Sequence, residues 1–299
     1  MIDVGILGLD TSHPETFAAI LDDREGVTVG AVWDGGDVRD ESYTTAFCEE
    51  YDAIRYDEPR ELIGEVDAIM ILTVDWSVHR SLAVPFLEGG IPTMIDKPLA
   101  GSVADVDAIE AAAERGDAPL FGGSAVPFHP DAATVTELTP QTVFGSGYGD
   151  PFYYGAHLID TVRLAVDADW TRVEPVDAAE QIIAISFENG ATATVHFDGP
   201  ETEGSFSFLC VSDDETGVTK IESTVTELER MYDPFLDGFL ETARGERDER
   251  DRLVDGAQLL LAVQQAFETG EPFPPGEDAS ATAPTIDSAA FVATYEPYY

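Results

Sequence analysis

The sequence predicts an α/β protein in two parts: a doubly wound parallel sheet in residues 1–121, then an α+β domain with a mostly antiparallel sheet in residues 122–299. In the first part, short apolar runs alternate with amphipathic segments, the pattern of parallel strands connected by helices. In the second part apolar runs follow one another, and Asn189-Gly190 between two of them signals a hairpin. The length of 299 residues is sufficient for two such domains.

The first strand is expected from Ile2 to Leu7 and ends at Gly8. A helix should begin near Pro14, since proline suits the first helical turn and apolar residues follow at helical spacing. The remaining strands of this part are expected at 27–33, 68–74, 92–95 and 120–121, and the helices at 41–51, 78–87 and 103–115. Strands and helices that alternate in this way predict a Rossmann-type dinucleotide-binding domain.

The pattern changes after residue 122. Helices are expected at 153–166, 234–243 and 253–267, and strands at 170–176, 181–187, 191–197 and 206–211. Residues 271–284, rich in proline, glycine and small side chains, are expected to form a loop. The tail that ends at Tyr299 carries aromatic residues and is expected to pack against the rest of the chain.

The charge balance is strongly acidic, with 59 aspartate and glutamate residues against 15 lysine and arginine residues and a formal net charge of −44. The acids occur in every segment, so nucleic acid and anionic membranes are excluded as partners by repulsion. Such repulsion is tolerable at roughly 1 M salt, where the Debye length is about 3 Å. The composition therefore predicts a halophilic protein from a high-salt cytoplasm.

Cysteine use and hydropathy favour the same location. Cys48 and Cys210 lie far apart and form neither a disulfide framework nor a zinc motif, which favours a reducing cytoplasm. No apolar run approaches 18 residues, and the N-terminus is interpreted as a strand rather than a signal peptide. The five histidines show no metal-ligand spacing, so no metal is predicted.

The turn after the first strand is a candidate anion site, because a strand, a glycine and a helix N-terminus hold phosphates in this kind of fold. Gly8 stands where the first glycine of G-x-G-x-x-G belongs, but Asp10 and His13 occupy the second and third glycine positions. Thr11 and Ser12 offer hydroxyl groups for a pyrophosphate. The alternative is that Asp10 or Ser12 only caps the helix.

An acid at the end of the second strand is the candidate ribose ligand. Asp34 lies 26 positions after Gly8, and a carboxylate there accepts hydrogen bonds from ribose hydroxyls and repels a 2′-phosphate. This favours NAD over NADP as cofactor. Asp37 is close enough to compete for the role, and a solvated acid without a ligand is the other interpretation.

Asp96-Lys97-Pro98 directly follows a buried strand, at the edge of the sheet where such folds hold ligands. Only two lysines occur in the chain, Lys97 and Lys220, which makes each a candidate for a specific task. A partly buried lysine there can act as acid or base. The alternative is a surface lysine paired with Asp96.

The helix expected at 153–166 carries a second candidate group. His157 and Asp160 share one face of it, so the carboxylate can fix the imidazole tautomer. Tyr153 lies one turn earlier on the same face. The alternatives are a histidine satisfied inside the core, and an Asp160 neutralised by Arg163.

The third long strand and the helix after it supply Thr73 and His79, which are expected to line the same crevice and to contact the cofactor. The alternative for His79 is a surface position at the helix N-terminus. His129 and His196 are interpreted as structural.

Together these residues resemble the glucose–fructose oxidoreductase, inositol dehydrogenase and rhizopine-catabolism (Gfo/Idh/MocA) family over nearly the whole chain. The resemblance is carried by the apolar strand that ends at Gly8, by residues 75–79 and 96–98, and by Gly155-x-His157-x-x-Asp160. They are similar to the family's Pro-x-x-x-His and Glu-Lys-Pro segments and to its helix with the catalytic histidine.

The resemblance implies an NAD(P)-dependent dehydrogenase acting on sugars, polyols or related hydroxy compounds. Lys97 would orient substrate and cofactor, His157 would exchange the proton of the substrate hydroxyl, and Asp160 would orient His157. Family members usually pair their C-terminal sheets into dimers or tetramers. The sequence departs from the family at Asp10 and at Tyr153, which stands where an aspartate is common. Two alternatives therefore stay open: a redox-inactive sensor or accessory protein, and a lyase or hydrolase on the same fold.

Overall fold

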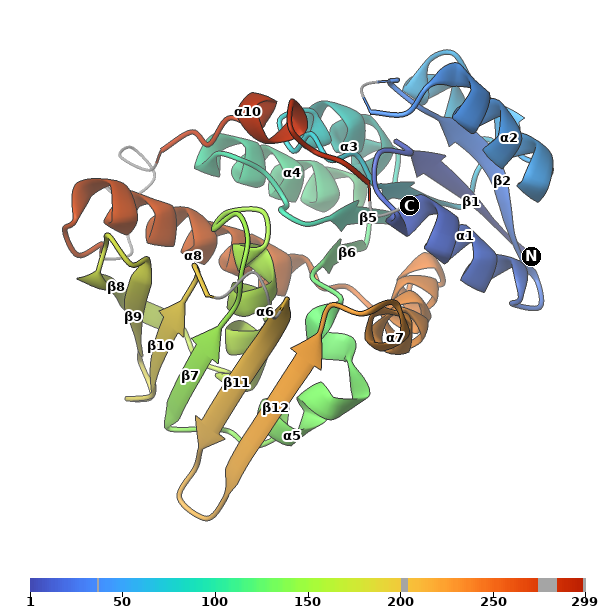
Figure 1. The fold of residues 1–299 in the computed structure, drawn as a ribbon. Helices are drawn as coiled ribbons and strands as arrows, with labels where there is room; N and C mark the ends of the chain where they lie inside the picture. The colour runs from blue at the N-terminus through green and yellow to red at the C-terminus, as the bar shows by residue number, and fades with distance from the viewer. Residues whose placement is uncertain (37, 200–203, 274–283, 298–299) are drawn as a thin grey trace.

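The computed structural model describes residues 1–36, 38–199, 204–273 and 284–297, and these form two sheets of six strands each, with helices around them (Figure 1). The first sheet has the order β3-β2-β1-β4-β5-β6 and is parallel throughout. Its strands are β1 (Ile2–Leu7), β2 (Val27–Trp33), β3 (Ile54–Arg55), β4 (Ala68–Ile71), β5 (Thr93–Asp96) and β6 (Leu120–Gly123). This is the doubly wound Rossmann-like sheet that the alternating pattern predicts.

The strands of this sheet are continuous apolar runs because helices cover both faces. β4 is buried at every position, and β5 likewise. The connecting helices are α1 (His13–Asp22), α2 (Glu41–Tyr51), α3 (His79–Glu88) and α4 (Val103–Gly116), with a short 3-10 helix at Pro59–Leu62. α4 begins at the N-cap Ser102, whose side chain accepts the backbone N–H of Asp105.

The second sheet has the order β12-β11-β7-β10-β9-β8. Its strands are β7 (Thr142–Ser146), β8 (Trp170–Asp177), β9 (Ile182–Phe187), β10 (Thr192–His196), β11 (Ser205–Val211) and β12 (Thr216–Glu222). Every neighbouring pair is antiparallel except β7 and β10, which are parallel. Gly190, with φ +84°, closes the predicted hairpin between β9 and β10.

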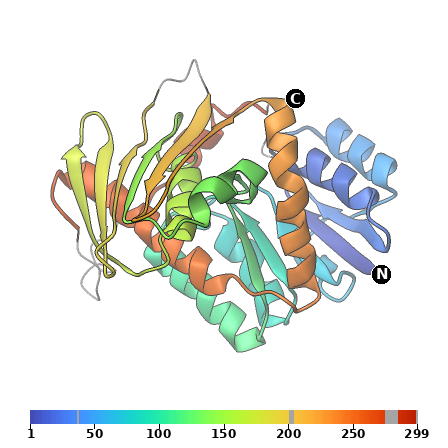
Figure 2. The ribbon, with the colours of Figure 1, turned by 90° about the horizontal axis from the view of Figure 1, so that it is seen from below.

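Helices pack between and beside the two sheets. α6 (Gly155–Ala165) contacts β7 and α8 (Arg250–Thr269), and nearly all of its residues are buried. α7 (Val225–Ala243) contacts α1 and β6 and so joins the second half of the chain to the first (Figure 2). The short elements are α5 (Ala133–Thr136), α10 (Ala289–Val292) and 3-10 helices at Val126–Phe128 and Pro130–Ala132.

Several helix boundaries differ from the prediction, including that of α8, which begins at Arg250 and not at residue 253. The helix expected from residue 153 begins at Gly155, because the Asp150 carboxylate accepts the N–H groups of Phe152 and Tyr153 and forms a turn before it. The helix expected from residue 234 begins nine residues earlier at Val225 and contains the proline inside it. Most of the loop expected at 271–284 and the last two tail residues lie outside the described part of the chain.

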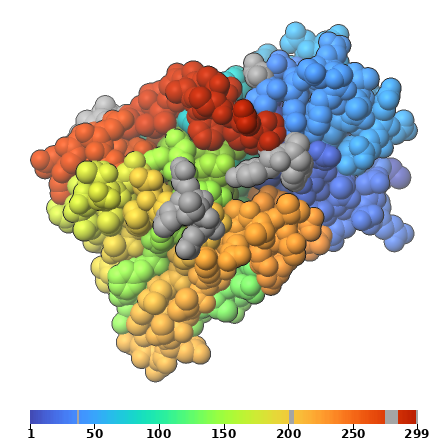
Figure 3. Space-filling model, in the orientation of Figure 1, coloured from blue at the N-terminus to red at the C-terminus, as the bar shows by residue number. Residues whose placement is uncertain are grey.

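The C-terminal segment, residues 284–297, returns to the Rossmann-like half. The Ile286 N–H donates to the carbonyl of Gly101, and the Trp76 Nε1–H donates to the carbonyl of Ile286 at 2.8 Å. The Ser288 hydroxyl donates to the Asp75 carboxylate. The expected packing of the aromatic tail is thus found, and the segment lies across the surface toward the N-terminal residues (red in Figure 3). Among the described residues, no helix is long and apolar enough to cross a membrane.

Candidate functional site

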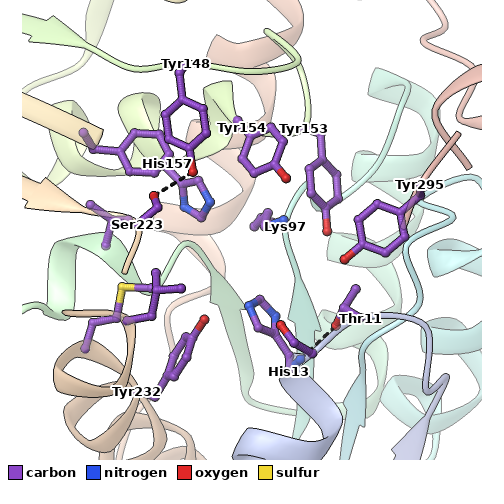
Figure 4. A pocket seen from close by; sticks show the side chains of 15 residues that line it. Thr11, His13, Lys97, Tyr148, Tyr153, Tyr154, His157, Ser223, Tyr232 and Tyr295 are labelled. Atoms are coloured by element: carbon purple, nitrogen blue, oxygen red, sulfur yellow. Dashed lines mark hydrogen bonds between the residues drawn. The ribbon is translucent and has the colours of Figure 1, made fainter. Parts of the chain in front are cut away.

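A pocket lies where the carboxyl ends of the parallel strands face the second half of the chain (Figure 4). Its wall carries the turn after β1, the residue after β5, helices α6 and α7, and the C-terminal segment. The lining residues are Thr11, Ser12, His13, Lys97, Val126, Tyr148, Tyr153, Tyr154, His157, Phe206, Ser223, Leu228, Met231, Tyr232 and Tyr295. None of them is acidic, although the chain carries 59 acids.

The free cavity volume is about 50 Å³, which is much less than the roughly 300–1,000 Å³ of typical ligand sites. A ligand larger than a few water molecules therefore enters only if lining side chains move. Tyr295 belongs to the C-terminal segment and stands beside Thr11 and Tyr153 at the edge of the pocket (Figure 4).

Lys97 lies at the centre of the pocket and is 4% exposed. Its Nζ stands over the ring of Tyr153, 3.1 Å from the centroid, and 5.4 Å from the centroid of Tyr154. Burial lowers the pKa of the amine to about 8, although the charges of Asp96 and Asp150 oppose the change. The amine is therefore mostly charged at neutral pH and deprotonates far more readily than a surface lysine.

His157 faces Lys97 from α6, so the two expected groups line one pocket. Its Nδ1 lies 2.6 Å from the Ser124 hydroxyl, and that hydroxyl also accepts the Val126 N–H at 3.0 Å. Burial, followed by the nearby charge of Lys97, holds the pKa of His157 well below its usual value. The imidazole is therefore neutral at physiological pH.

Asp160 does not orient His157 as the resemblance implies. Its Oδ2 accepts the backbone N–H of Ser124 at 2.6 Å, and Arg252 Nη1 lies 3.8 Å from the same oxygen. Arg163, the other expected partner, pairs with Asp255 instead. Burial raises the pKa of Asp160, and its bond to the backbone of Ser124 holds the residue whose hydroxyl contacts His157.

The turn after β1 is tight because β1 and β4 approach closely there. Gly8 has φ +89°, and a Cβ on it would lie 2.4 Å from Thr73 Cγ2. Asp10 is 2% exposed, and its Oδ2 accepts the Val74 N–H at 2.9 Å. The Asp10 carboxylate therefore points toward the segment after β4 and away from the open side of the turn. Ser12 is the N-cap residue of α1, but its side chain makes no cap hydrogen bond, so the alternative of a side-chain cap is not found at Ser12.

Asp34 directly follows β2 and lies beside this turn. Its Oδ1 accepts the Leu9 N–H at 2.9 Å, and its Oδ2 accepts the Thr44 hydroxyl at 3.1 Å. Each carboxylate oxygen has further lone pairs, so the group can also accept hydrogen bonds from a ribose. The competitor Asp37 lies outside the described residues.

Thr73 and His79 lie behind the pocket and not in its lining. His79 is completely buried, and its ring nitrogens lie 3.2 Å from the Leu99 carbonyl and 3.0 Å from the Thr73 carbonyl. The expected cofactor contact of His79 is wrong, because the ring has no surface for a ligand. It connects the segments after β4 and β5, and burial lowers its pKa.

Sequence reasoning missed a pair at the floor of the pocket. His13 begins α1, and its Nδ1 lies 2.7 Å from Oδ2 of Asp96, the last residue of β5. The two residues are 83 positions apart, so no local spacing reveals the contact. The unusual histidine at the third glycine position was the one available signal.

Aromatic side chains form most of the remaining wall; Tyr153 was among the predicted site residues, and the others were missed. Tyr148 donates its hydroxyl hydrogen to Ser223 Oγ at 2.6 Å, and Tyr232 contacts the His13 ring edge-on at 5.4 Å. Tyr153 stacks at 4.4 Å from Phe291 of the C-terminal segment. Burial, followed by Tyr295, raises the pKa of Tyr153 well above its usual value, so its hydroxyl stays protonated.

One cluster of potential metal ligands occurs in the described residues, at His129, Asp131 and Glu227. His129 Nδ1 accepts the Asp131 N–H, so its Nε2 carries the hydrogen and donates to Glu227 at 3.1 Å. Arg230 pairs with both acids. The three side chains are thus held by hydrogen bonds and ion pairs with one another and with Arg230.

The residues around the β1–α1 turn fit a dinucleotide. Asp34 has lone pairs for a ribose, and the N-terminus of α1, with the Thr11 and Ser12 hydroxyls, offers donors for phosphates. Asp10 does not oppose this, since its carboxylate is buried against Val74. Pro14 removes one N–H from the first turn, so fewer backbone donors are present than in a glycine-rich turn.

Comparison with known proteins agrees with this geometry. Residues 2–123 match the family described as "Oxidoreductase family, NAD-binding Rossmann fold" (GFO_IDH_MocA). No curated protein matches the chain by sequence.

Several solved structures share the fold. One is scyllo-inositol dehydrogenase from Lactobacillus casei with bound NAD(H) and scyllo-inositol, at 14% identity and a TM-score of 0.75, covering 92% of this chain and 99% of that one. Myo-inositol 2-dehydrogenase from Lactobacillus plantarum gives the same identity, TM-score and coverage. GenD2 from gentamicin A biosynthesis, in complex with NAD, has 15% identity and a TM-score of 0.78 over 92% of this chain and 96% of its own.

The structural likenesses establish the fold over nearly the whole chain, and the family match covers the N-terminal part that carries Gly8, Asp34 and Lys97. Residues 2–123 therefore resemble the NAD-binding Rossmann fold of the Gfo/Idh/MocA oxidoreductases.

Proposed function

We propose that this NAD-binding oxidoreductase interconverts a secondary alcohol and a ketone on a sugar, a polyol or a related hydroxy compound. One observation carries the proposal: Lys97 of the Rossmann-like half and His157 of the other half line a single pocket beside the dinucleotide-binding turn. The inositol dehydrogenases with the same fold act on compounds of this class, which supports the choice.

When bound, NAD supplies the acceptor or donor of the hydride. Asp34, Thr11 and Ser12 would hold it, and Asp34 would disfavour the 2′-phosphate of NADP. The Lys97 ammonium would hold the substrate oxygen and stabilise negative charge on it. The aromatic walls offer ring faces to the C–H face of a sugar ring, and the tyrosine hydroxyls offer hydrogen bonds to its hydroxyls.

The test is a titration of NADH and of NADPH at molar salt, followed by tryptophan fluorescence, since Trp33 neighbours Asp34. Saturable quenching by NADH, weaker quenching by NADPH, and reduction of NAD with at least one member of a panel of inositols, hexoses and sugar acids are expected. Binding of NADH without turnover on the whole panel would contradict the substrate class. Absence of quenching by both dinucleotides would favour the redox-inactive alternative.

We also propose that the chain works as a homo-oligomer joined through the outer face of its second sheet. Phe144 of β7 and Val218 of β12 are 48% and 65% exposed, and Leu209 of β11 lies between them in register. This apolar stripe is unusual on so acidic a surface. Replacement of Phe144 and Val218 by aspartate should reduce the mass measured by light scattering to that of one chain. An unchanged mass would contradict this interface.

The halophilic character and the cytoplasmic location stay predictions from composition, and so do the domain limits 1–121 and 122–299. A salt series of circular dichroism spectra tests the first, with unfolding expected below molar salt.

A further inference from the structure

The pocket holds two imidazoles, and only one of them has a carboxylate partner. His13 Nδ1 lies 2.7 Å from Asp96 Oδ2, whereas His157 Nδ1 lies 2.6 Å from the Ser124 hydroxyl. The partner decides which nitrogen of a neutral imidazole keeps its hydrogen and therefore what the ring can do with a ligand.

Asp96 is an ionised acceptor. It is 2% exposed, and burial alone would raise its pKa, but His13 and then Lys97 outweigh burial and lower the pKa to about 2. Its Oδ1 accepts the backbone N–H of Lys97 at 2.8 Å, which leaves Oδ2 for His13. An ionised carboxylate has no hydrogen to donate, so Nδ1 of His13 carries the hydrogen and Nε2 of the neutral ring has a lone pair.

The His13 ring is held in a fixed orientation. It stacks on Phe17 with centroids 4.9 Å apart and planes 12° apart, and the edge of Tyr232 meets it at 5.4 Å. The His13 side chain is 15% exposed and lines the pocket. Its other ring nitrogen, Nε2, is therefore accessible from the pocket. Such a ring can accept a proton without first changing its position.

His157 has the opposite arrangement. The Ser124 Oγ accepts the Val126 N–H with one lone pair, and we assign its own hydrogen to the bond with His157 Nδ1. With Nδ1 as the acceptor, Nε2 carries the ring hydrogen and can only donate. Burial and Lys97 hold the pKa of this ring well below its usual value, so it is a weak base. Tyr153 lies four residues before His157, at the position where an aspartate is common in the family. A carboxylate there would raise the basicity of His157, whereas the tyrosine ring does not.

We propose that His13, oriented by Asp96, is the general base of the site, and that His157 donates a hydrogen bond to the substrate oxygen. This rests on the proposed dehydrogenase function. In the oxidation, the substrate O–H bond breaks, its proton goes to Nε2 of His13, and its electron pair forms the carbonyl. The carbinol hydrogen leaves with its electron pair, and NAD is the oxidant. Asp96 is a positioning residue.

Four titratable groups face His13: Asp96 of β5, Lys97 after it, Tyr232 of α7 and, across the pocket, His157 of α6. Lys97, with a pKa of about 8, is the second group that a pH profile will report. The ionisation of Lys97 should therefore remain in the pH profile of a His13 variant.

The first test needs no substrate. Protein labelled with 15N-histidine is studied by NMR at molar salt and pH 8, and its five histidines are assigned with H13Q and H157Q. We expect His13 to carry hydrogen on Nδ1 with a bare Nε2, and His157 to carry hydrogen on Nε2. Hydrogen on Nε2 of His13, or a bare Nε2 on His157, would overturn the proposal.

The second test is kinetic, with NAD and the best substrate of the panel. H13A should lose about 10² to 10⁴-fold in kcat, and added imidazole should restore part of it. D96N should lose a similar factor without rescue, because the amide donates to Nδ1 and reverses the tautomer while His13 still fills the space. H157Q should mainly raise KM. H196Q, on β10 and away from the pocket, is the matched control and should leave kcat unchanged.

Two results would contradict the role of His13. One is a raised Kd for NADH in H13A with unchanged kcat, which would make His13 a dinucleotide ligand. The other is a lost kcat that imidazole does not restore. If no compound of the panel is oxidised, the proposed substrate class is wrong. The NMR experiment tests the positions of the hydrogens on His13 and His157 independently of any substrate.

Discussion

Replacement of Lys97 by methionine should stabilise the protein at neutral pH while it abolishes turnover. The amine has a pKa of about 8 in the folded chain, against 10.5 for a lysine in water. Each pKa unit corresponds to about 1.4 kcal/mol, so the buried charge costs the folded state about 3 kcal/mol. The contact of Nζ with the Tyr153 ring returns up to about 2 kcal/mol of this. The net gain expected for K97M is therefore about 1–3 kcal/mol.

The gain should depend on pH in one direction. Below pH 8 the folded and unfolded chains both carry the ammonium, and its full cost is present. Between about 8 and 10.5 the unfolded chain binds more protons at this site, so the stability of the wild type rises with pH. Above 10.5 the charge is absent in both states, and the wild type loses its disadvantage.

Urea denaturation at molar salt, followed by tryptophan fluorescence across this pH range, measures the difference between wild type and K97M. The matched control is K220M, since Lys220 is 44% exposed and lies 3.5 Å from Glu222 at the surface. It should change the free energy of unfolding little at any pH. A K97M protein less stable than the wild type at neutral pH, or a pH-independent difference, would refute the reasoning.

Further substitutions test the neighbouring features. Gly8→Ala should destabilise by several kcal/mol in urea denaturation, because its Cβ would lie 2.4 Å from Thr73 Cγ2 at a φ of +89°; a loss under about 1 kcal/mol would show that the strands can separate. Asp34→Ser should raise the Kd of NADH about tenfold in the fluorescence titration and that of NADPH less; equal effects would show no ribose contact. Trp76→Phe removes the bond to the Ile286 carbonyl and should speed proteolysis of the C-terminal segment, and an unchanged cleavage rate would contradict its anchoring role.

The parallel half of the fold follows from the sequence because most of its strands are largely apolar runs and they alternate with amphipathic helices. β12 was missed for a physical reason. Its buried face carries Gly217, Thr219 and Ile221, while Val218 points outward, so the alternation of apolar and polar residues is weak. An oligomer interface on the outer face would account for such a strand, and a single sequence does not show it.

Site residues could be predicted only where a sequence motif lies within a single helix or at the end of a single strand. Lys97 at a strand end and His157 on a helix were found in this way, and both line the pocket. The partners of the imidazoles could not be found, since Asp96 reaches His13 across 83 residues and Ser124 reaches His157 across 33. Such contacts are set by how strand ends meet in three dimensions, and side-chain spacing along one helix wrongly suggested Asp160.

The segment that ends at Tyr295 has a consequence for experiments that cut the protein into pieces. Thr11 and Tyr295 line the same pocket, and the backbone of Ile286 is hydrogen-bonded to Trp76 and Gly101. A recombinant fragment limited to residues 1–121 would expose the indole of Trp76 and lack one wall of its ligand site. Affinities measured on that fragment would then describe an open crevice, and a bulky fusion placed after Tyr295 would disturb the intact one.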